Sequence, residues 1–229
     1  MKKFVSVLLA ALLLFALAAC GTAAPEETSV PEITAHYRDA GYYNEDNALV
    51  TIDYYDENGH IIGDEVYDNG VLTTYELFQK TENYSFEIPE LEDSADVVST
   101  EYMELLTRSA EEGSEYHSSG MVFVFGYDAN DHMRMAKVFA LDAEGNILFN
   151  YIIYYQLDEH GNFTGWTHMT ESGEVLFEMQ AENVYDGDML ASADYHYTRY
   201  GSIVSDDAGY HYQAQDEPTG YTLHVLVEY

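Results

Sequence analysis

The chain has 229 residues, with 8 Lys and Arg against 42 Asp and Glu, and its formal net charge is −34 at pH 7. So few cations exclude nucleic-acid binding, whose affinity comes from Lys and Arg on phosphates, and disfavour binding to anionic lipid headgroups. Hydrophobic residues make up 47% of the chain, which is enough to bury a core and excludes a wholly disordered protein.

The first twenty residues have the features of a secretory signal. Lys2 and Lys3 precede an apolar run that is shorter than the ~20 residues of a membrane-spanning helix, and Leu-Ala-Ala leads directly to Cys20. This segment resembles the lipobox of bacterial lipoproteins. The resemblance implies a signal peptide over residues 1–19, acylation of Cys20, and a lipid-anchored position on the extracytoplasmic face of the cell membrane, as in Gram-positive lipoproteins. The alternative is an uncleaved signal anchor.

Cys20 is the only cysteine, so the remaining chain has neither a disulfide nor a thiol nucleophile, and acylation accounts for the odd thiol. After it, residues 21–34 read GTAAPEETSVPEIT, which are small, acidic and interrupted by two prolines. We therefore expect an acylated cysteine and flexible acidic tether over residues 20–36, and a β-rich domain over residues 37–229.

One theme recurs along this domain: a run rich in Tyr, Val, Ile and Phe ends in Tyr-Asp or Leu-Asp, and a turn with Gly or Asn follows. Asp opens turns by accepting hydrogen bonds from nearby backbone, and Gly or Asn takes the positive φ that closes a hairpin. The turns fall at residues 55–59, 67–70, 127–131, 141–145, 157–161 and 185–187, with a weaker one at 171–173. The pattern predicts a mainly β fold.

These Tyr/Leu-Asp-x-x-Gly turns resemble those of YD-repeat (RHS-like) β-hairpin proteins of bacterial surfaces, over residues 48–79 and 121–201. The resemblance implies hairpin architecture and an extracellular setting, and no activity. We expect an antiparallel β-meander of repeated hairpins, arranged as a single open sheet or a sandwich. The residues themselves leave one layer, a sandwich and a barrel open.

Residues 94–112 differ from the rest. Val98, Tyr102, Leu105 and Leu106 recur at helical spacing, with Asp93 or Ser94 available as N-cap and Gly113 as terminator. We expect one amphipathic helix packed on the sheet.

The single tryptophan, Trp166, lies in the hairpin after the turn at residues 157–161. A four-residue loop would place Trp166 opposite Ile153, and a second loop at residues 170–173 would place it opposite Phe177. Side chains alternate along a strand, so Trp166 falls on the apolar face of this hairpin. The pattern favours Trp166 as a core residue, with His168 hydrogen-bonded near the sheet edge.

The chemistry-bearing residues form no catalytic motif. The nine histidines include no H-E-x-x-H pair, no G-x-S-x-G elbow or glycine-rich phosphate loop is present, and the Asp-rich turns fail the spacing of a calcium-binding EF-hand. With 42 acids, a carboxylate pair carries no information. We expect no enzyme activity, no metal site and no cofactor.

The 22 tyrosines are the remaining indication of function. Tyrosine stacks on sugars and packs against protein partners, although it is also simply a good strand residue. The candidate ligand-binding residues are Tyr154, Trp166, Tyr195 and Tyr197. We expect a non-enzymatic binding module for a glycan or a protein. The alternatives are an envelope-associated hydrolase acting on polysaccharide or peptide, and a structural spacer or accessory subunit of a membrane assembly.

Overall fold

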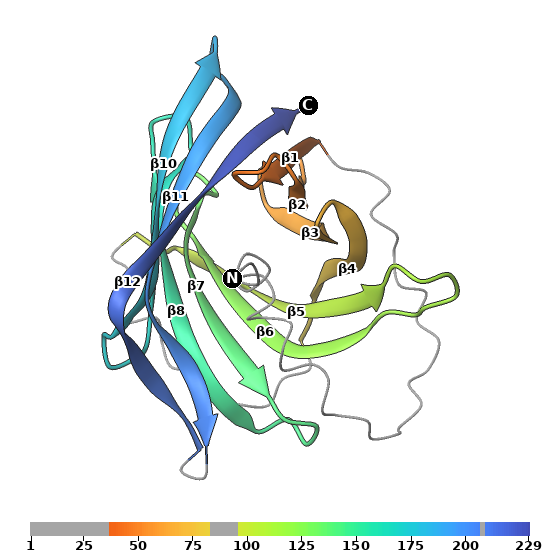
Figure 1. Ribbon diagram of the computed structural model, residues 1–229, viewed down its shortest axis with the longest axis vertical. Coiled ribbons are helices and arrows are strands. Elements are labelled where there is room, and N and C mark those ends of the chain that lie inside the picture. Colours follow the sequence, from red (N-terminus) through yellow and green to blue (C-terminus); the bar gives the residue numbers. More distant parts are fainter. Residues whose placement is uncertain (1–36, 83–95, 207–208) are drawn as a thin grey trace.

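The computed structural model describes residues 37–82, 96–206 and 209–229. Within them the chain forms twelve antiparallel strands that close into one barrel (Figure 1). The strands are β1 Arg38–Tyr43, β2 Leu49–Tyr55, β3 Ile61–Asp68, β4 Val71–Lys80, β5 Ser99–Ser109, β6 His117–Tyr127, β7 Met133–Leu141, β8 Ile147–Leu157, β9 Phe163–Met169, β10 Val175–Asp186, β11 Met189–Asp206 and β12 Gly209–Glu228.

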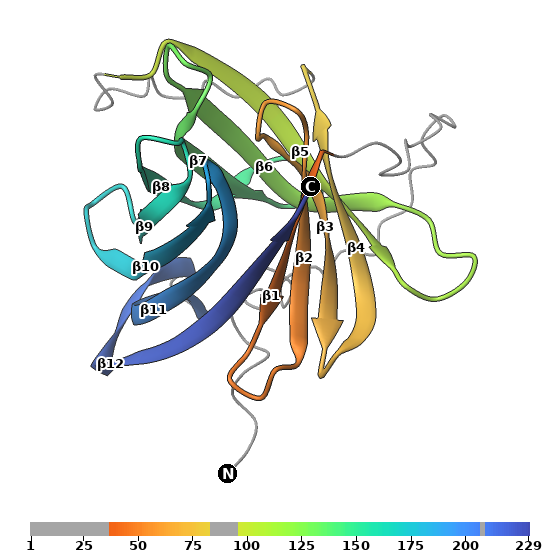
Figure 2. The ribbon, with the colours of Figure 1, turned by 90° about the horizontal axis from the view of Figure 1, so that it is seen from above.

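The barrel is closed by its first and last strands, so the expectation of an open sheet or a sandwich is wrong. β1 pairs with β12 from Asp39 opposite Glu228 to Tyr43 opposite His224. Every other pairing joins strands that are consecutive in the sequence, as expected for a meander. Closure satisfies the edges that an open sheet would leave unpaired. Strands β1–β4 and β8–β12 form opposite walls (Figure 2).

The predicted helix at residues 94–112 is also wrong, because this segment contains β5. Residues 94 and 95 lie outside the described residues, and none of the described residues is helical. Leu105 and Leu106 are 3% and 8% exposed, although neighbours on a strand point to opposite faces. Because both faces of β5 carry apolar residues, the two-residue period was hidden, and pairing with β4 and β6 overrode local helix propensity.

The turns are as predicted, and several share one geometry. In the turn at residues 142–146, the amide of Asp142 donates to the Asn146 carbonyl at 2.9 Å, and the amide of Gly145 donates to the Asp142 carbonyl at 3.0 Å. The carboxylate of Asp142 accepts the amides of Glu144 and Asn146 at 3.0 and 2.8 Å. The same pattern recurs in the turns that begin at Asp56, Asp128 and Asp158.

In each of these turns the fourth residue has a positive φ, which glycine adopts without strain. In the hairpin between β3 and β4, Asn69 and Gly70 both have a positive φ, as a two-residue hairpin loop requires. The local chemistry of Asp and Gly therefore determines where each strand ends.

The tryptophan hairpin has the predicted faces but a different register. Trp166 lies opposite Tyr155 on β8 and opposite Met179 on β10, two residues away from the predicted partners Ile153 and Phe177. One residue of each shift comes from the turn, because pairing begins at Leu157 with Phe163 and at Val175 with Met169. The second residue comes from bulges near Leu157 and between Val175 and Phe177. A shift of two residues preserves the face, so Trp166 still points into the barrel.

The interior contains two adjoining clusters of buried side chains. One is formed mainly by β6–β8 and is apolar, whereas the other joins β1 and β2 to β10–β12 and is rich in tyrosine. Trp166 packs against both. The larger buried members of the two clusters are Met121, Phe123, Phe125, Tyr151 and Ile153, and Tyr42, Tyr55, Met179, Tyr195 and Tyr197.

Candidate functional site

A cavity of about 210 Å³ lies at the end of the barrel where the hairpins after β2, β6 and β8 turn. Its wall combines aromatic and aliphatic side chains with a similar share of polar ones. The side chains that line it include those of Tyr37, Arg38, Ala40, Tyr42, Tyr55, Asp56, Glu57, Asn58, His60, Asp131, His132, Met133, Leu157, His160, Asn162, Phe163, Leu190, Tyr195, Val225, Val227 and Tyr229. A concave apolar site with a few convergent polar groups is the usual form of a small-molecule site.

The rim of the cavity is built from contacts between the equivalent turns. His60 Nε2 lies 3.1 Å from the carbonyl oxygen of Asp131 and 3.5 Å from its carboxylate, and the His60 ring lies 4.4 Å from that of Tyr127. Gly161 faces His132 so closely that an added Cβ would lie 2.8 Å from Nε2. The shared turn geometry therefore brings the turns after β2, β6 and β8 into one rim.

Arg38 is the one lysine or arginine among the described residues that line the cavity. Its Nη1 donates to Asn162 Oδ1 at 3.1 Å, and its guanidinium lies 4.3 Å from the ring centroid of Tyr55. Its Nε is buried and has no hydrogen-bond partner within the described part of the chain. Arg38 Nε therefore keeps a hydrogen-bond donor that no described residue uses.

The floor of the cavity consists of tyrosines that rest on a buried carboxyl group. The hydroxyl of Tyr55 donates to Asp53 at 3.3 Å and lies 3.5 Å from the hydroxyl of Tyr42, and Thr51 donates to the other oxygen of Asp53 at 3.3 Å. Burial raises the pKa of both tyrosines well above the usual range, so their hydroxyls stay neutral donors. Burial raises the pKa of Asp53 to about 6, although hydrogen bonds from Tyr42, Tyr55 and Thr51 and the charge of Arg38 oppose this.

Three of the four residues predicted from the sequence to bind a ligand come together. The ring centroid of Trp166 lies 5.7 Å from that of Tyr195 and 5.9 Å from that of Tyr197, and Tyr195 also lines the cavity. Trp166 Nε1 is buried without a partner among the described residues. Tyr154 does not join them, because it alternates with Ile153 and Tyr155 and so lies on the outer face of β8.

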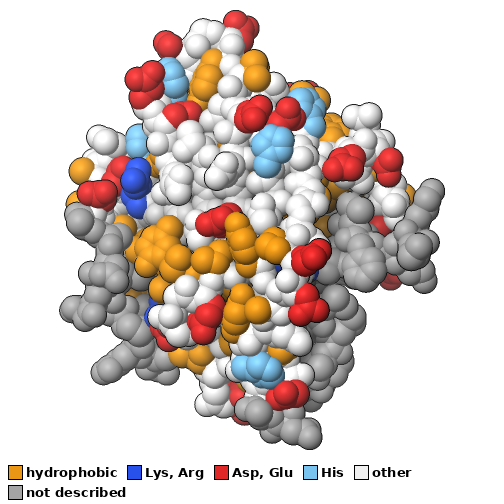
Figure 3. All heavy atoms as spheres, turned by 60° about the vertical axis from the view of Figure 1, so that its left-hand side comes forward, with side chains coloured by type: hydrophobic (Ala, Val, Ile, Leu, Met, Phe, Trp, Pro, Cys, Tyr) orange, Lys and Arg blue, Asp and Glu red, His pale blue; other side chains and the backbone are white. Residues whose placement is uncertain are grey.

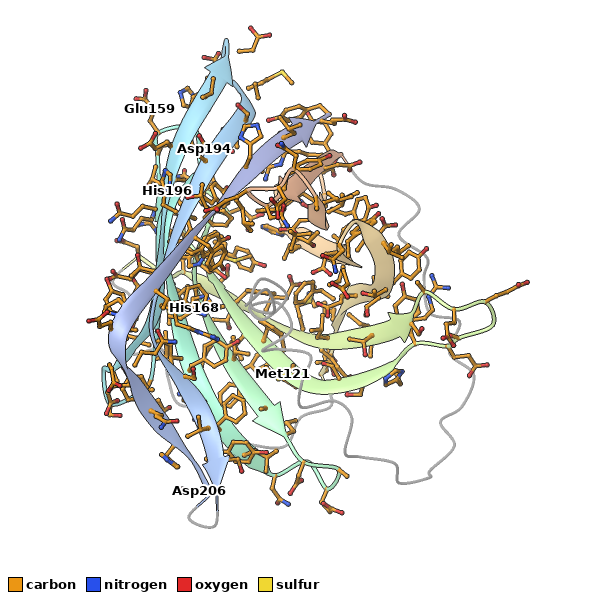
Figure 4. The ribbon with its side chains drawn as sticks, viewed as in Figure 1. Met121, Glu159, His168, Asp194, His196 and Asp206 are labelled. Carbon is orange, nitrogen blue, oxygen red and sulfur yellow. The ribbon has the colours of Figure 1, made fainter. Side chains whose placement is uncertain are left out.

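His168 is an interior residue and not the edge residue that the sequence indicated. Its ring lies 5.5 Å from that of Tyr151 and 3.9 Å from that of Phe177 (Figure 4). Burial lowers its pKa to about 3, so His168 is neutral at physiological pH. It functions as a packing residue.

The sequence reasoning missed Arg38, Asp53, Tyr42 and Tyr55. Arg38 is one of only eight lysines and arginines in a very acidic chain, and this scarcity could have drawn attention to it. Asp53 occupies a position within an otherwise apolar strand, LVTIDYY, which is a second available signal. The pairing of β1 with β12 could not be predicted from the sequence, so the cavity that it helps to form could not be predicted either.

Figure 3 shows acidic and histidine side chains interspersed with apolar ones on the outer face on the side of β10–β12. His224 Nδ1 lies 2.8 Å from Asp194 Oδ1, and His196 Nε2 lies 3.7 Å from Glu182 Oε1, all on exposed side chains (Figure 4). Across residues 37–82, 96–206 and 209–229, no group of three or more His, Cys, Asp or Glu is arranged to hold a metal ion. These contacts join exposed side chains, and such surface contacts contribute little to stability.

The described residues contain no helix long and apolar enough to cross a membrane. No protein family and no curated protein sequence matches this chain. Among solved structures, a porin-like protein from Bacteroides uniformis is similar at a TM-score of 0.25 and 10% identity, over 83% of this chain and 96% of that one. A similarity of that size identifies neither a family nor a function for this chain.

Proposed function

We propose that this protein is a binding protein that holds one small polar ring, such as a terminal sugar of a glycan, in the cavity at the end of its barrel. The observation that supports this most directly is the convergence of Arg38 with the hydroxyls of Tyr42 and Tyr55 beneath an aromatic and aliphatic wall. Hydroxyl and guanidinium donors orient a polyhydroxylated ligand, and aromatic faces stack on its apolar side.

The size of the cavity limits the ligand. About 210 Å³ corresponds to roughly seven water molecules, which is room for a single ring and not for an oligomer. Asp56, Glu57 and Asp131 at the rim disfavour an anionic ligand. A longer glycan would therefore enter by its end, with the remainder outside the rim.

The barrel form argues against recognition of an extended peptide by strand addition. A closed barrel offers no free sheet edge for an added strand, because β1 and β12 pair with each other. Nine tyrosines that a flat sheet would have displayed belong to, or pack against, the interior clusters: Tyr42, Tyr55, Tyr127, Tyr151, Tyr155, Tyr195, Tyr197, Tyr212 and Tyr221. These features favour a ligand bound at the end of the barrel over a partner gripped by its side.

Saturation-transfer NMR with glucose and N-acetylglucosamine tests this function. We expect saturation transfer to the ring protons of at least one sugar, and we expect Arg38→Met to abolish it. Tyr154→Phe is the matched control, since it changes a tyrosine on the outer face and should leave the transfer intact. Absence of transfer to either sugar, or equal transfer with Arg38→Met, would refute sugar binding in this cavity and would favour the spacer role.

The cell-envelope position remains part of the proposal. The Leu-Ala-Ala-Cys sequence ending at Cys20 supports a lipid-anchored, extracytoplasmic protein, although residues 1–36 lie outside the described residues. Two or more acyl chains would be needed for stable anchoring, at about 0.8 kcal/mol per buried CH₂. Cys20→Ser should leave the chain unprocessed or release it to the medium. A Cys20→Ser protein that is still processed and membrane-bound would contradict lipidation.

A further inference from the structure

Three carboxyl groups form a row inside the barrel next to the cavity. Asp53 on β2 lies directly opposite Asp64 on β3, and Asp64 lies directly opposite Glu76 on β4. Directly opposed residues place their Cβ atoms about 4.5–5.5 Å apart. Asp64 and Glu76 are each 5% exposed and Asp53 is half-buried, so water screens this row only weakly. We call these three residues the carboxyl row.

Full ionisation of the carboxyl row is disfavoured in this environment, because adjacent buried carboxylates repel one another and lose their hydration. Burial, together with the charge of Asp53, raises the pKa of Glu76 to about 7. Burial and the charge of Glu76 raise the pKa of Asp64 well above its usual range. One oxygen of Asp64, Oδ1, is buried without a partner within the described part of the chain, so the row is not a completed hydrogen-bond network.

The groups that face the carboxyl row come from several strands, and one of them is a cation. Arg38 on β1 lowers the pKa of Asp53, whereas Glu65 on β3 adds further negative charge beside Asp64. Thr107 on β5 lies opposite Glu76 and is 3.4 Å from the ring of the exposed His117. The remaining facing groups are neutral hydroxyls, those of Thr51, Tyr42, Tyr55, Tyr195 and Tyr197. A single guanidinium cannot neutralise three carboxylates.

The row is connected to the cavity through Asp53. As a carboxylate, Asp53 accepts hydrogen bonds from the hydroxyls of Tyr55 and Tyr42, both of which line the cavity. As a carboxylic acid, it accepts less strongly and itself carries a donor. The protonation state of the row therefore decides whether these tyrosine hydroxyls are held by Asp53 or are available to a ligand.

We propose that the carboxyl row is a proton-controlled switch for the cavity, in which protonation of Asp53, Asp64 and Glu76 frees the hydroxyls of Tyr42 and Tyr55 to donate to a bound ligand. A ligand that accepts hydrogen bonds is then held more tightly in mildly acidic than in neutral surroundings. The switch rests on the proposed function for the identity of its ligand, but its operation can be measured without one.

Carbon-13 NMR of the ligand-free protein, with labelled carboxyl and tyrosine Cζ carbons, tests the switch between pH 4.5 and 8.5. We expect the three carboxyl signals to titrate together, with Asp64 and Glu76 changing at higher pH than exposed acids. The Cζ signals of Tyr42 and Tyr55 should move over the same interval. In Asp64→Asn, and independently in Glu76→Gln, the midpoint of the tyrosine change should shift to lower pH, because a repelling charge is removed.

Glu217→Gln is the matched control, since it removes one acid from an exposed position on β12 and should leave the tyrosine midpoint unchanged. Tyrosine signals that stay constant while the carboxyls titrate would overturn the switch, as would an unchanged midpoint in both row variants. Sugar binding is scored separately. Loss of sugar transfer with intact tyrosine titration would reject the ligand and keep the switch, and the opposite result would reject the switch alone.

Discussion

Two walls of the same barrel follow the same alternation and yet enclose different chemistry. Along β6–β8 the inward residues are apolar without exception in the buried cluster, with Phe125 and Val138 at 3% and 0% exposure. Along β2–β4 the corresponding inward positions include Asp53, Asp64 and Glu76. The first wall is stabilised by burial of apolar area at any pH, whereas we expect the second to lose stability as its carboxyl groups ionise. Backbone pairing therefore sets the form of the barrel, and the inward residues set the conditions under which each wall is stable.

The apolar wall should give the largest effect. Phe125→Ala removes a buried ring that contacts Phe123 and Phe78, and we expect a loss of about 3–5 kcal/mol in the free energy of unfolding. The loss should be the same at pH 5 and pH 8, measured by urea denaturation. Leu148→Ala, at a site 39% exposed, is the control and should cost less than about 0.5 kcal/mol. If the loss of unfolding free energy in Phe125→Ala differed between pH 5 and pH 8, the apolar wall would not be independent of pH as we expect.

The acidic wall should make stability depend on pH. Because the pKa values of Asp53 and Glu76 are raised to about 6 and about 7, the folded protein binds more protons than the unfolded chain between pH 4 and 7. The free energy of unfolding should therefore fall as pH rises through that interval. Asp64→Asn should flatten this slope and raise stability at pH 8 by about 2 kcal/mol, measured by urea denaturation. If the free energy of unfolding changed with pH by the same slope in the wild type and in Asp64→Asn, the carboxyl row would not be the cause of the pH dependence.

The turns allow a sharper comparison between the cavity rim and the opposite end of the barrel. Gly145 and Gly161 occupy the same position in equivalent turns, with φ of 83° and 80°, but only Gly161 has a neighbour, His132. Each substitution to Ala should cost roughly 1 kcal/mol for the left-handed backbone. Gly161→Ala should cost more and should also weaken sugar binding, because His132 must move. Equal losses in both variants, by thermal denaturation, would show that the rim is not tightly packed.

The smallest effect concerns Trp166, which packs against both interior clusters. Its fluorescence emission should be blue-shifted and protected from acrylamide, since the indole lies among Tyr155, Phe163, Tyr195 and Tyr197. Tyr154→Phe on the outer face should leave the emission unchanged. Red-shifted, readily quenched emission would place the indole in contact with water. The interior of the barrel around Trp166 would then be accessible to solvent.

Features encoded by adjacent residues were predictable from the sequence. The turns at Asp56, Asp128, Asp142 and Asp158 follow from how Asp and Gly use the backbone, and Trp166 was assigned to the correct face. The register was wrong by two residues, because the turns and the bulges next to them insert residues that alternation alone does not reveal.

Features that depend on distant residues were not predictable. Closure of the barrel depends on β1 meeting β12, and β5 became a strand because β4 and β6 pair with it on either side. The carboxyl row was hidden for a different reason. In a chain with 42 acids, only the inward direction of Asp53, Asp64 and Glu76 distinguishes them from solvated ones. The cavity and the carboxyl row both depend on closure of the barrel. Because the closure could not be predicted from the sequence, neither of them could be predicted.

The pairing of β1 with β12 also has a consequence for how the chain folds. Every other pair of strands is a hairpin and can form as soon as its two strands exist, whereas the pair of Asp39 and Glu228 joins residues near opposite ends of the domain. Until β12 is synthesised, β1 presents an unpaired edge that other chains could join. The barrel is therefore vulnerable to aggregation during synthesis, and the speed of this single closing step determines how long that vulnerability lasts.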